Sequence, residues 1–198
     1  MRILLGLALL AAACRPHAPR TAIDPRLAAQ VPEDSSAIAG FNPAAFRNLT
    51  TAFADERYVL VALRGTEVLA ITPRGGAPSA PHRPSPLLEE AERLAERSPA
   101  WAVIRGGTVL PLQGNLANLN RFLRDASLVS LTAQGGDPVT IEMTASSPTP
   151  ESAMQFEKSL RAVMVLTKLG SPAELRRDGQ TVRASLTVAP DSLSKLLH

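Results

Sequence analysis

The sequence predicts an α+β fold in which helices cover a mostly antiparallel sheet. Residues 138–146 and 181–188 alternate strictly between apolar and polar side chains, which is typical of strands with one buried and one solvated face. Residues 58–63 and 67–72 are apolar segments on either side of a glycine-containing turn, which is the pattern of a β-hairpin. Residues 149–169 place apolar side chains at helical spacing and predict a long helix.

The remaining elements are shorter. Residues 36–41 form a short apolar segment that predicts a strand. Residues 101–104 are apolar on both faces and predict a central strand, with Trp101 in the core. Residues 87–97 predict a charged helix. Further helices are expected over residues 115–125, after Asn42-Pro43 and after Asp191.

The expected elements follow one another in the order β-α-β-β-α twice, and then a hairpin and a helix. This order divides a single domain of residues 31–198 into two similar parts, 31–98 and 99–198, in which Ala37 aligns with Trp101. The order resembles that of ferredoxin-like βαββα units, and the resemblance implies helices on one face of the sheet.

The chain also resembles uncharacterised bacterial exported proteins that contain duplicated units of this kind. The similar stretches are Val31-Pro32-Glu33-Asp34, the hairpin that begins at Tyr58, and the pattern from Asp137 to Leu160. This resemblance implies a duplicated α+β fold, and it implies no particular function.

The N-terminus has the pattern of a secretory signal peptide over residues 1–13. Arg2 supplies a positive charge, and the apolar run behind it ends in three alanines and is shorter than the ~20 residues that cross a membrane. The only cysteine, Cys14, follows directly. Leu10-Ala11-Ala12-Ala13-Cys14 resembles the lipobox of bacterial lipoproteins, which implies cleavage before Cys14 and a lipid anchor on its thiol, with acyl chains such as palmitate. The alternative is an unmodified cysteine at the end of a cleaved signal.

Two segments are predicted to lack regular structure. Residues 14–30 are rich in proline and arginine and predict a flexible, lipid-anchored tether. Its arginines either lie against anionic lipid head groups or are simply solvated. Residues 73–86 hold five prolines and two glycines and predict a mobile loop.

The inventory of reactive side chains favours a protein without catalysis. The three histidines, His17, His82 and His198, lie outside every predicted element, so the sequence positions no histidine for a nucleophilic or metal site, and no cofactor is expected. Ser192 and Lys195 match a Ser-x-x-Lys pattern, but the partner motifs of that chemistry are absent from the sequence. The net charge of +3 contains no basic block, which argues against nucleic acid as a partner.

These observations predict a membrane-anchored lipoprotein of the bacterial cell envelope, on the periplasmic or extracytoplasmic side, that binds or scaffolds an envelope protein. The expected binding surface is the polar face of the two alternating strands, which comprises Thr140, Glu142, Thr144, Arg183 and Ser185. One alternative is a carrier or sensor of a small molecule or lipid, bound between sheet and helices. A further alternative is an enzyme that uses carboxylates such as Asp34, Asp137 or Glu142.

Overall fold

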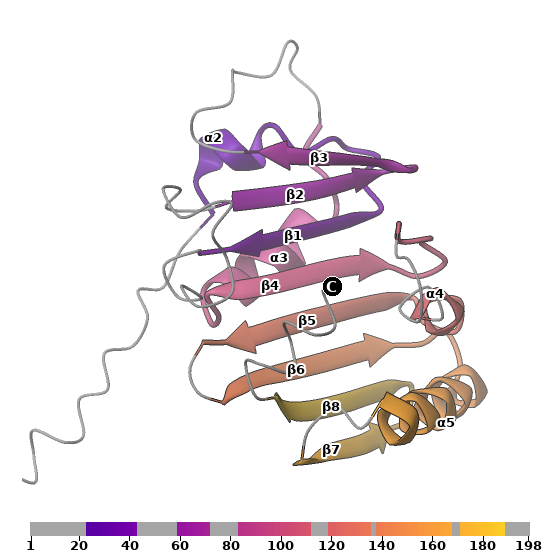
Figure 1. The fold of residues 1–198 in the computed structure, drawn as a ribbon. Helices are drawn as coiled ribbons and strands as arrows, with labels where there is room; N and C mark the ends of the chain where they lie inside the picture. Colours follow the sequence, from indigo (N-terminus) through magenta and orange to yellow (C-terminus); the bar gives the residue numbers. More distant parts are fainter. Residues whose placement is uncertain are drawn as a thin grey trace, which may run out of the picture.

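The computed structural model describes residues 23–42, 59–71, 83–111, 119–135, 138–167 and 171–188. Within these residues, eight strands form one sheet with the order β3-β2-β1-β4-β5-β6-β8-β7 (Figure 1). The strands are β1 (Ala37–Phe41), β2 (Val59–Arg64), β3 (Glu67–Ile71), β4 (Ala100–Arg105), β5 (Leu128–Gln134), β6 (Val139–Ser146), β7 (Ser171–Asp178) and β8 (Thr181–Val188). The helices are α2 (Pro25–Ala28), α3 (Leu88–Ala95), α4 (Leu119–Phe122) and α5 (Pro150–Thr167).

Every neighbouring pair of strands is antiparallel, so the prediction of an α+β fold with a mostly antiparallel sheet is confirmed. The ferredoxin-like arrangement of each unit is not confirmed. In such a unit the strands joined by a helix are separated by a third strand. Here β1 pairs directly with β2, and β4 pairs directly with β5. The described strands instead run outward from the β1–β4 pair, as β3-β2-β1 on one side and β4-β5-β6 on the other.

The two faces of the sheet carry separate hydrophobic cores. Side chains alternate between the faces along each strand, so the paired residues Ile38 and Val103 lie on one face, which we call the α3 face. Their neighbours Ala37 and Ile104 lie on the other, which we call the α5 face. The α3 face holds a buried cluster that includes Ile38, Trp101 and Val103, and the α5 face holds a second cluster that includes Ala37, Ile104 and Phe156.

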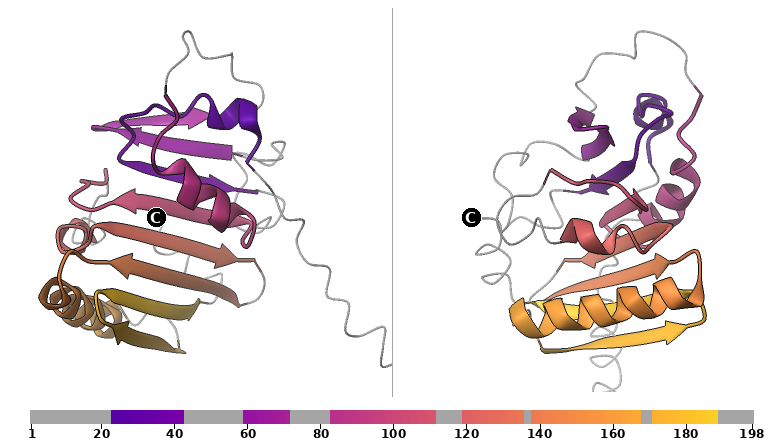
Figure 2. Two further views of the ribbon diagram at one scale, coloured as in Figure 1. Left: turned by 180° about the vertical axis from the view of Figure 1, so that it is seen from behind. Right: turned by 90° about the vertical axis from the view of Figure 1, so that its right-hand side faces the viewer.

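Helices therefore lie on both faces, and the expectation of helices on one face is not confirmed. Figure 2 shows α3 on one side of the sheet, over β1 and β4, and α5 on the other, by β7 and β8. The reason is the composition of the central strands. Because β4 is apolar on both faces, as its sequence predicts, both of its faces need cover from water.

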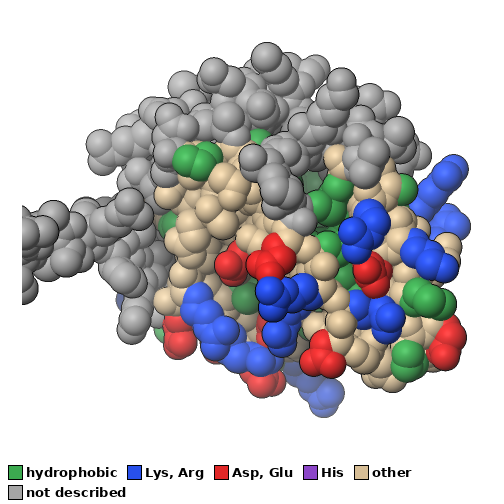
Figure 3. Space-filling view, turned by 90° about the horizontal axis from the view of Figure 1, so that it is seen from below, with side chains coloured by type: hydrophobic (Ala, Val, Ile, Leu, Met, Phe, Trp, Pro, Cys, Tyr) green, Lys and Arg blue, Asp and Glu red, His purple; other side chains and the backbone are tan. Residues whose placement is uncertain are grey.

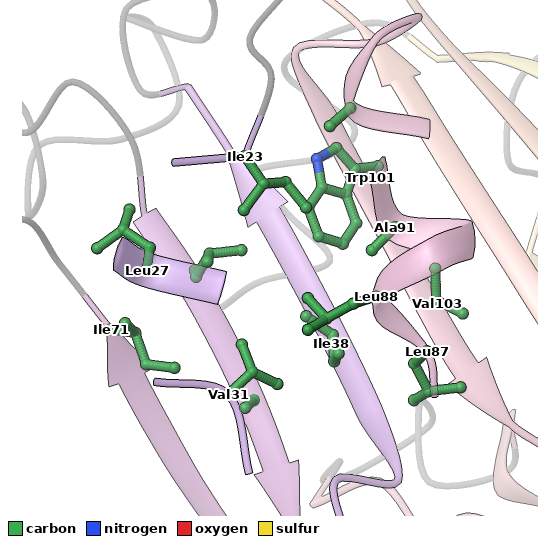
Figure 4. Close-up of a cluster of buried hydrophobic side chains, with 13 residues drawn as sticks. Ile23, Leu27, Val31, Ile38, Ile71, Leu87, Leu88, Ala91, Trp101 and Val103 are labelled. Carbon is green, nitrogen blue, oxygen red and sulfur yellow. The ribbon is translucent and has the colours of Figure 1, made fainter. Parts of the chain in front are cut away.

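On the α3 face, α2 and α3 close the core. Figure 4 shows Trp101 from β4 in one cluster with Ile23, Ile38 and Ala91. Trp101 is buried, as predicted. Ala91 and Ala95 of α3 are buried too, and these small side chains let the helix approach the sheet closely.

On the α5 face, α5 is stabilised by a side-chain cap at its N-terminus, by a buried aromatic contact and by ion pairs. The backbone N–H of Ser152 donates to Thr149 Oγ1 at 3.1 Å, which caps the first turn. Phe156 is buried and meets the ring of Phe122 edge-on, with 6.4 Å between centroids.

Glu157 of α5 forms ion pairs with two arginines. Its Oε1 accepts a hydrogen bond from Arg161 Nη2 at 3.0 Å, and this bond keeps the pKa of Glu157 below its ordinary value, although burial acts to raise that pKa. Arg177 Nε, 3.1 Å from Glu157 Oε2, lowers the same pKa and ties α5 to β7.

The predicted tether is wrong over its last residues. Ile23 and Leu27 are buried in the core of the α3 face, and Asp24 caps α2 by accepting from the backbone N–H of Arg26 at 2.8 Å. Residues 23–30 thus belong to the folded domain, because two apolar side chains at helical spacing cover β1 to β3. At the end of the proline-rich segment, Ser85 is also buried.

Several predictions lie outside the described residues. These are the signal peptide with Cys14, the tether up to residue 22, the helix after Asn42-Pro43, residues 73–82 of the proline-rich loop and the C-terminal helix. None of the helices in the described ranges is long and apolar enough to cross a membrane.

Candidate functional site

The five side chains predicted as a binding surface lie together on the α3 face. The register of β6 and β8 places Thr144 opposite Arg183 and Glu142 opposite Ser185. Thr140 follows Glu142 two residues earlier on β6 and points to the same face. All five are exposed or partly exposed. Figure 2 shows that α3 covers β1 and β4 on this face. The helix α5 packs against β8 from the opposite face, and no described helix packs on this face of β6 and β8.

The neighbouring strands extend this surface in both directions. On β5, Ser130 lies opposite Thr144 and Thr132 lies opposite Glu142. On β7, Arg176 lies opposite Arg183 and Glu174 lies opposite Ser185. The nine residues, which we call the polar patch, form two adjoining rows across four strands with Thr140 beside them. They are Ser130, Thr132, Thr140, Glu142, Thr144, Glu174, Arg176, Arg183 and Ser185.

Four of these residues, those on β5 and β7, were missed from the sequence. A signal for β5 was present, since Val129 and Leu131 alternate there with Ser130 and Thr132. No such alternation marks β7, whose sequence SPAELRRD has a proline near its start and charges at its end.

The polar patch carries two arginines and two glutamates, and these differ in whether they form ion pairs with described residues. Arg183 lies directly opposite Arg176, a like-charge pair that destabilises a sheet unless it is compensated. Arg176 forms an ion pair with Glu174 on its own strand. Glu142 and Arg183 form no ion pair with any described residue, and both are exposed. The patch therefore offers one carboxylate and one guanidinium to a ligand, among several hydroxyl groups.

The border between the polar patch and α3 is fixed by a short polar network. Ser130 Oγ donates to Glu90 Oε1 of α3 at 3.0 Å. Glu90 Oε2 in turn lies 2.6 Å from Arg93 Nη2. Because Ser130 is buried and its hydroxyl is bonded to an ionised group, α3 cannot slide over β5 without losing a charge-assisted hydrogen bond. The open part of the face thus has a defined edge.

The residues of the carboxylate alternative are not brought together. Asp34 lies in the turn before β1, whereas Glu142 lies on β6, with β4 and β5 between those strands. Asp137 and the three histidines lie outside the described residues. Within the described ranges, no three of the residues His, Cys, Asp and Glu cluster closely enough to hold a metal ion.

Comparisons of the chain with protein-family models, curated proteins and solved structures find no match. The polar patch is thus interpreted from its own geometry and chemistry.

Proposed function

We propose that this protein is a non-catalytic binding module of the bacterial cell envelope, anchored through an acylated Cys14, and that it docks an envelope protein on the polar patch. The observation that carries the proposal is the pair Glu142 and Arg183. Both charged groups are exposed on the part of the α3 face formed by β6 and β8, where no described helix packs, and neither forms an ion pair with a described residue.

The backbone geometry favours binding by these groups. Each side chain of the patch stands on a strand that pairs with a strand on both sides or, for β7, on one side. Groups on such strands are held in place before the ligand arrives, so less conformational entropy is lost on binding. The serine and threonine side chains have few rotatable bonds and both donate and accept hydrogen bonds.

The charge balance favours a protein over a polyanion as the partner. The patch has two arginines and two glutamates, and it has no aromatic side chain on which bases or sugar rings would stack. A protein surface with its own acidic and basic group in the reverse order would complement Glu142 and Arg183.

The proposed lipid anchor on Cys14 is supported by the signal-peptide pattern of the N-terminus. The thiol of Cys14 is the only sulfhydryl group of the chain, and thioether attachment of a diacylglycerol needs a thiolate as nucleophile. Attachment of several acyl chains gives stable membrane binding, which a single chain does not. The intact mass of the mature N-terminus from native cells tests this part. An unmodified Cys14, or retention of Met1, would overturn it.

The binding part is tested with a photoreactive amino acid placed at Thr144 of the full chain in native cells. We expect a discrete adduct with one envelope protein, which the additional substitution Arg183→Glu weakens at least about tenfold, because it replaces an attraction by a repulsion. The control position is Met154, which is exposed on α5 on the opposite face. An adduct that forms equally from Met154, or that ignores Arg183→Glu, would contradict docking on the polar patch.

A further inference from the structure

The two edges of the sheet are protected to different degrees. The edge strand β7 carries Pro172 and a register irregularity between Ser171 and Glu174. Its last five residues carry four charged side chains, those of Glu174, Arg176, Arg177 and Asp178. Figure 3, which views the molecule from the β7 side, shows acidic and basic side chains intermingled over this end. Prolines, bulges and charges are the features by which sheets prevent unwanted pairing at their edges.

The opposite edge strand, β3, has no proline and no register irregularity, and its one charged residue is Glu67 at its first position. Its register with β2 is continuous from Glu67 to Ile71. Val68 is 53% exposed, and Ala70 is exposed as well. No described element pairs with the outer side of β3. An exposed, regular and apolar edge strand is a template on which another strand adds.

The turn before β3 determines which backbone groups face outward. Arg64 and Glu67 pair across the two-residue turn Gly65-Thr66, and the pair that closes such a turn exchanges both of its backbone hydrogen bonds. Hydrogen-bonded and non-hydrogen-bonded residue pairs alternate along an antiparallel pair of strands. The backbone N–H and C=O groups of Leu69 and Ile71 therefore also face β2 and bond to it. The N–H and C=O groups of Val68 and Ala70 therefore point away from β2, at the outer edge.

The one charge of β3 is compensated within its own hairpin. Glu67 Oε2 lies 2.8 Å from Arg64 Nη2. The rest of the strand, Val68-Leu69-Ala70-Ile71, carries no charged or polar side chain.

We propose that two copies of this chain pair through β3, antiparallel and with a two-fold axis at Leu69, so that the sheets of both copies become one. In this register Val68 lies opposite Ala70 of the second copy, and the two exchange both of their outward backbone hydrogen bonds. The two Leu69 side chains lie opposite each other as a non-bonded pair. Each outward group of β3 thus finds a partner.

A second copy fits this edge better than an arbitrary strand because the arrangement is self-complementary. The apolar residues 68–70 of one copy meet the apolar residues 68–70 of the other, and a two-fold axis requires the same patch to serve on both sides. The two Glu67 side chains fall at opposite ends of the paired strands. Four residues of rise separate them by about 13 Å, beyond the ~8 Å over which exposed charges interact at physiological ionic strength.

The register makes a specific prediction for engineered thiols. In the full chain carrying Cys14→Ser, we compare Leu69→Cys with Val68→Cys under mild oxidation. Two residues directly opposite each other in a non-hydrogen-bonded pair have their Cβ atoms within reach of a disulfide. Two copies of residue 68 are diagonal neighbours, about 7–8 Å apart and only somewhat closer at their Cβ atoms, which exceeds the ~3.5–4.5 Å between Cβ atoms that a disulfide needs. We expect Leu69→Cys to form the disulfide-linked dimer at least about tenfold faster, although Val68 is the more exposed residue. Random collisions would give the reverse order, and that order would overturn the proposal.

A second measurement is the mass of the full chain by sedimentation over a concentration series. The double variant Val68→Lys/Ala70→Lys places charges on exposed positions of the edge, and Val109→Lys is the matched control because Val109 is 65% exposed and lies outside the sheet. We expect a dimer for the unaltered chain and for Val109→Lys, and a monomer for the double variant. A monomeric unaltered chain, or a dimer that withstands the double variant, would refute pairing through β3.

Discussion

Substitution of Gly106 by alanine probes a close approach of two backbone segments at the end of β4. Gly106 follows β4, and a Cβ atom at this position would lie 1.8 Å from the carbonyl oxygen of Ala126 and 2.7 Å from its carbonyl carbon. Real Cβ contacts do not fall below 3.0 Å, so the two backbone segments would have to separate by more than about 1 Å. No side-chain rotation relieves this overlap, because the obstructing atoms belong to the backbone.

The loss in the free energy of unfolding follows from the backbone hydrogen bonds that such a separation breaks. The N–H of Gly106 donates to the carbonyl oxygen of Ser127 at 2.8 Å, and the N–H of Gly107 donates to that of Leu123 at 2.7 Å. Each bond contributes about 1 kcal/mol, and overpacking adds about 1–3 kcal/mol. We therefore expect Gly106→Ala to lower the free energy of unfolding by about 3–5 kcal/mol.

Gly107→Ala is the matched control. Its φ of +75° is unfavourable for alanine, but a Cβ atom there would meet nothing within 4 Å. The expected loss is about 1–2 kcal/mol, from the backbone conformation alone. Urea denaturation of the full chain, followed by circular dichroism, measures both variants against the unaltered protein. If Gly106→Ala costs no more than Gly107→Ala, the close approach to Ala126 is not a feature of the folded protein.

Three further predictions concern α5. Phe156→Ala should cost about 3–5 kcal/mol in urea denaturation, whereas Met154→Ala, at a 40% exposed position, should change stability by less than about 0.5 kcal/mol. Thr149→Ala should cost about 1 kcal/mol through loss of the cap on Ser152, and Thr149→Ser should retain the cap; equal losses would argue against it. The lowered pKa of Glu157 stabilises the fold above the ordinary glutamate pKa of about 4.3, and this contribution disappears as the pH falls through the lowered value. Acid titrations of stability should therefore be shallower for Glu157→Gln, and an unchanged acid limb would contradict the ion pairs.

The elements that sequence reasoning located best are those with strong local patterns. The strict alternation in β6 and β8 predicted both strands nearly to the residue, and also which side chains share a face. Trp101 was assigned correctly to the core because β4 is apolar on both faces. These properties depend on short-range periodicity, which the sequence carries in full.

The arrangement of the elements depends on long-range contacts and was harder to predict. The order β-α-β-β-α is compatible with several strand orders, and the pairings of β1 with β2 and of β4 with β5 distinguish the observed sheet from ferredoxin-like units. Ile23 and Leu27 were assigned to a tether because prolines and arginines surround them, although both side chains find a buried site on the distant β-strands. The composition of a segment does not reveal a partner that lies elsewhere in the chain.

The candidate site was predicted in part for the same reason. Alternation alone predicts that Thr144 and Arg183 lie on the polar face of their strands, and the register places them on one face, directly opposite each other. The contribution of Arg176 depends on the irregular strand β7, and the link from Ser130 to Glu90 joins residues that are 40 positions apart. No local pattern encodes either of them.

The placement of the two cores on opposite faces has a consequence for how the fold comes apart. The β1–β4 pair contributes to both cores at once, since Ile38 and Val103 point to one and Ala37 and Ile104 to the other. Disruption of either core thus withdraws packing from the same two strands, and this shared pair couples the cores into one cooperative unit. Amide protons of β1 and β4 should be the last to exchange with deuterium, and those of β3 and β7 the first. The β1–β4 pair in the middle of the sheet, and not its edge strands β3 and β7, sets the global stability of the described fold.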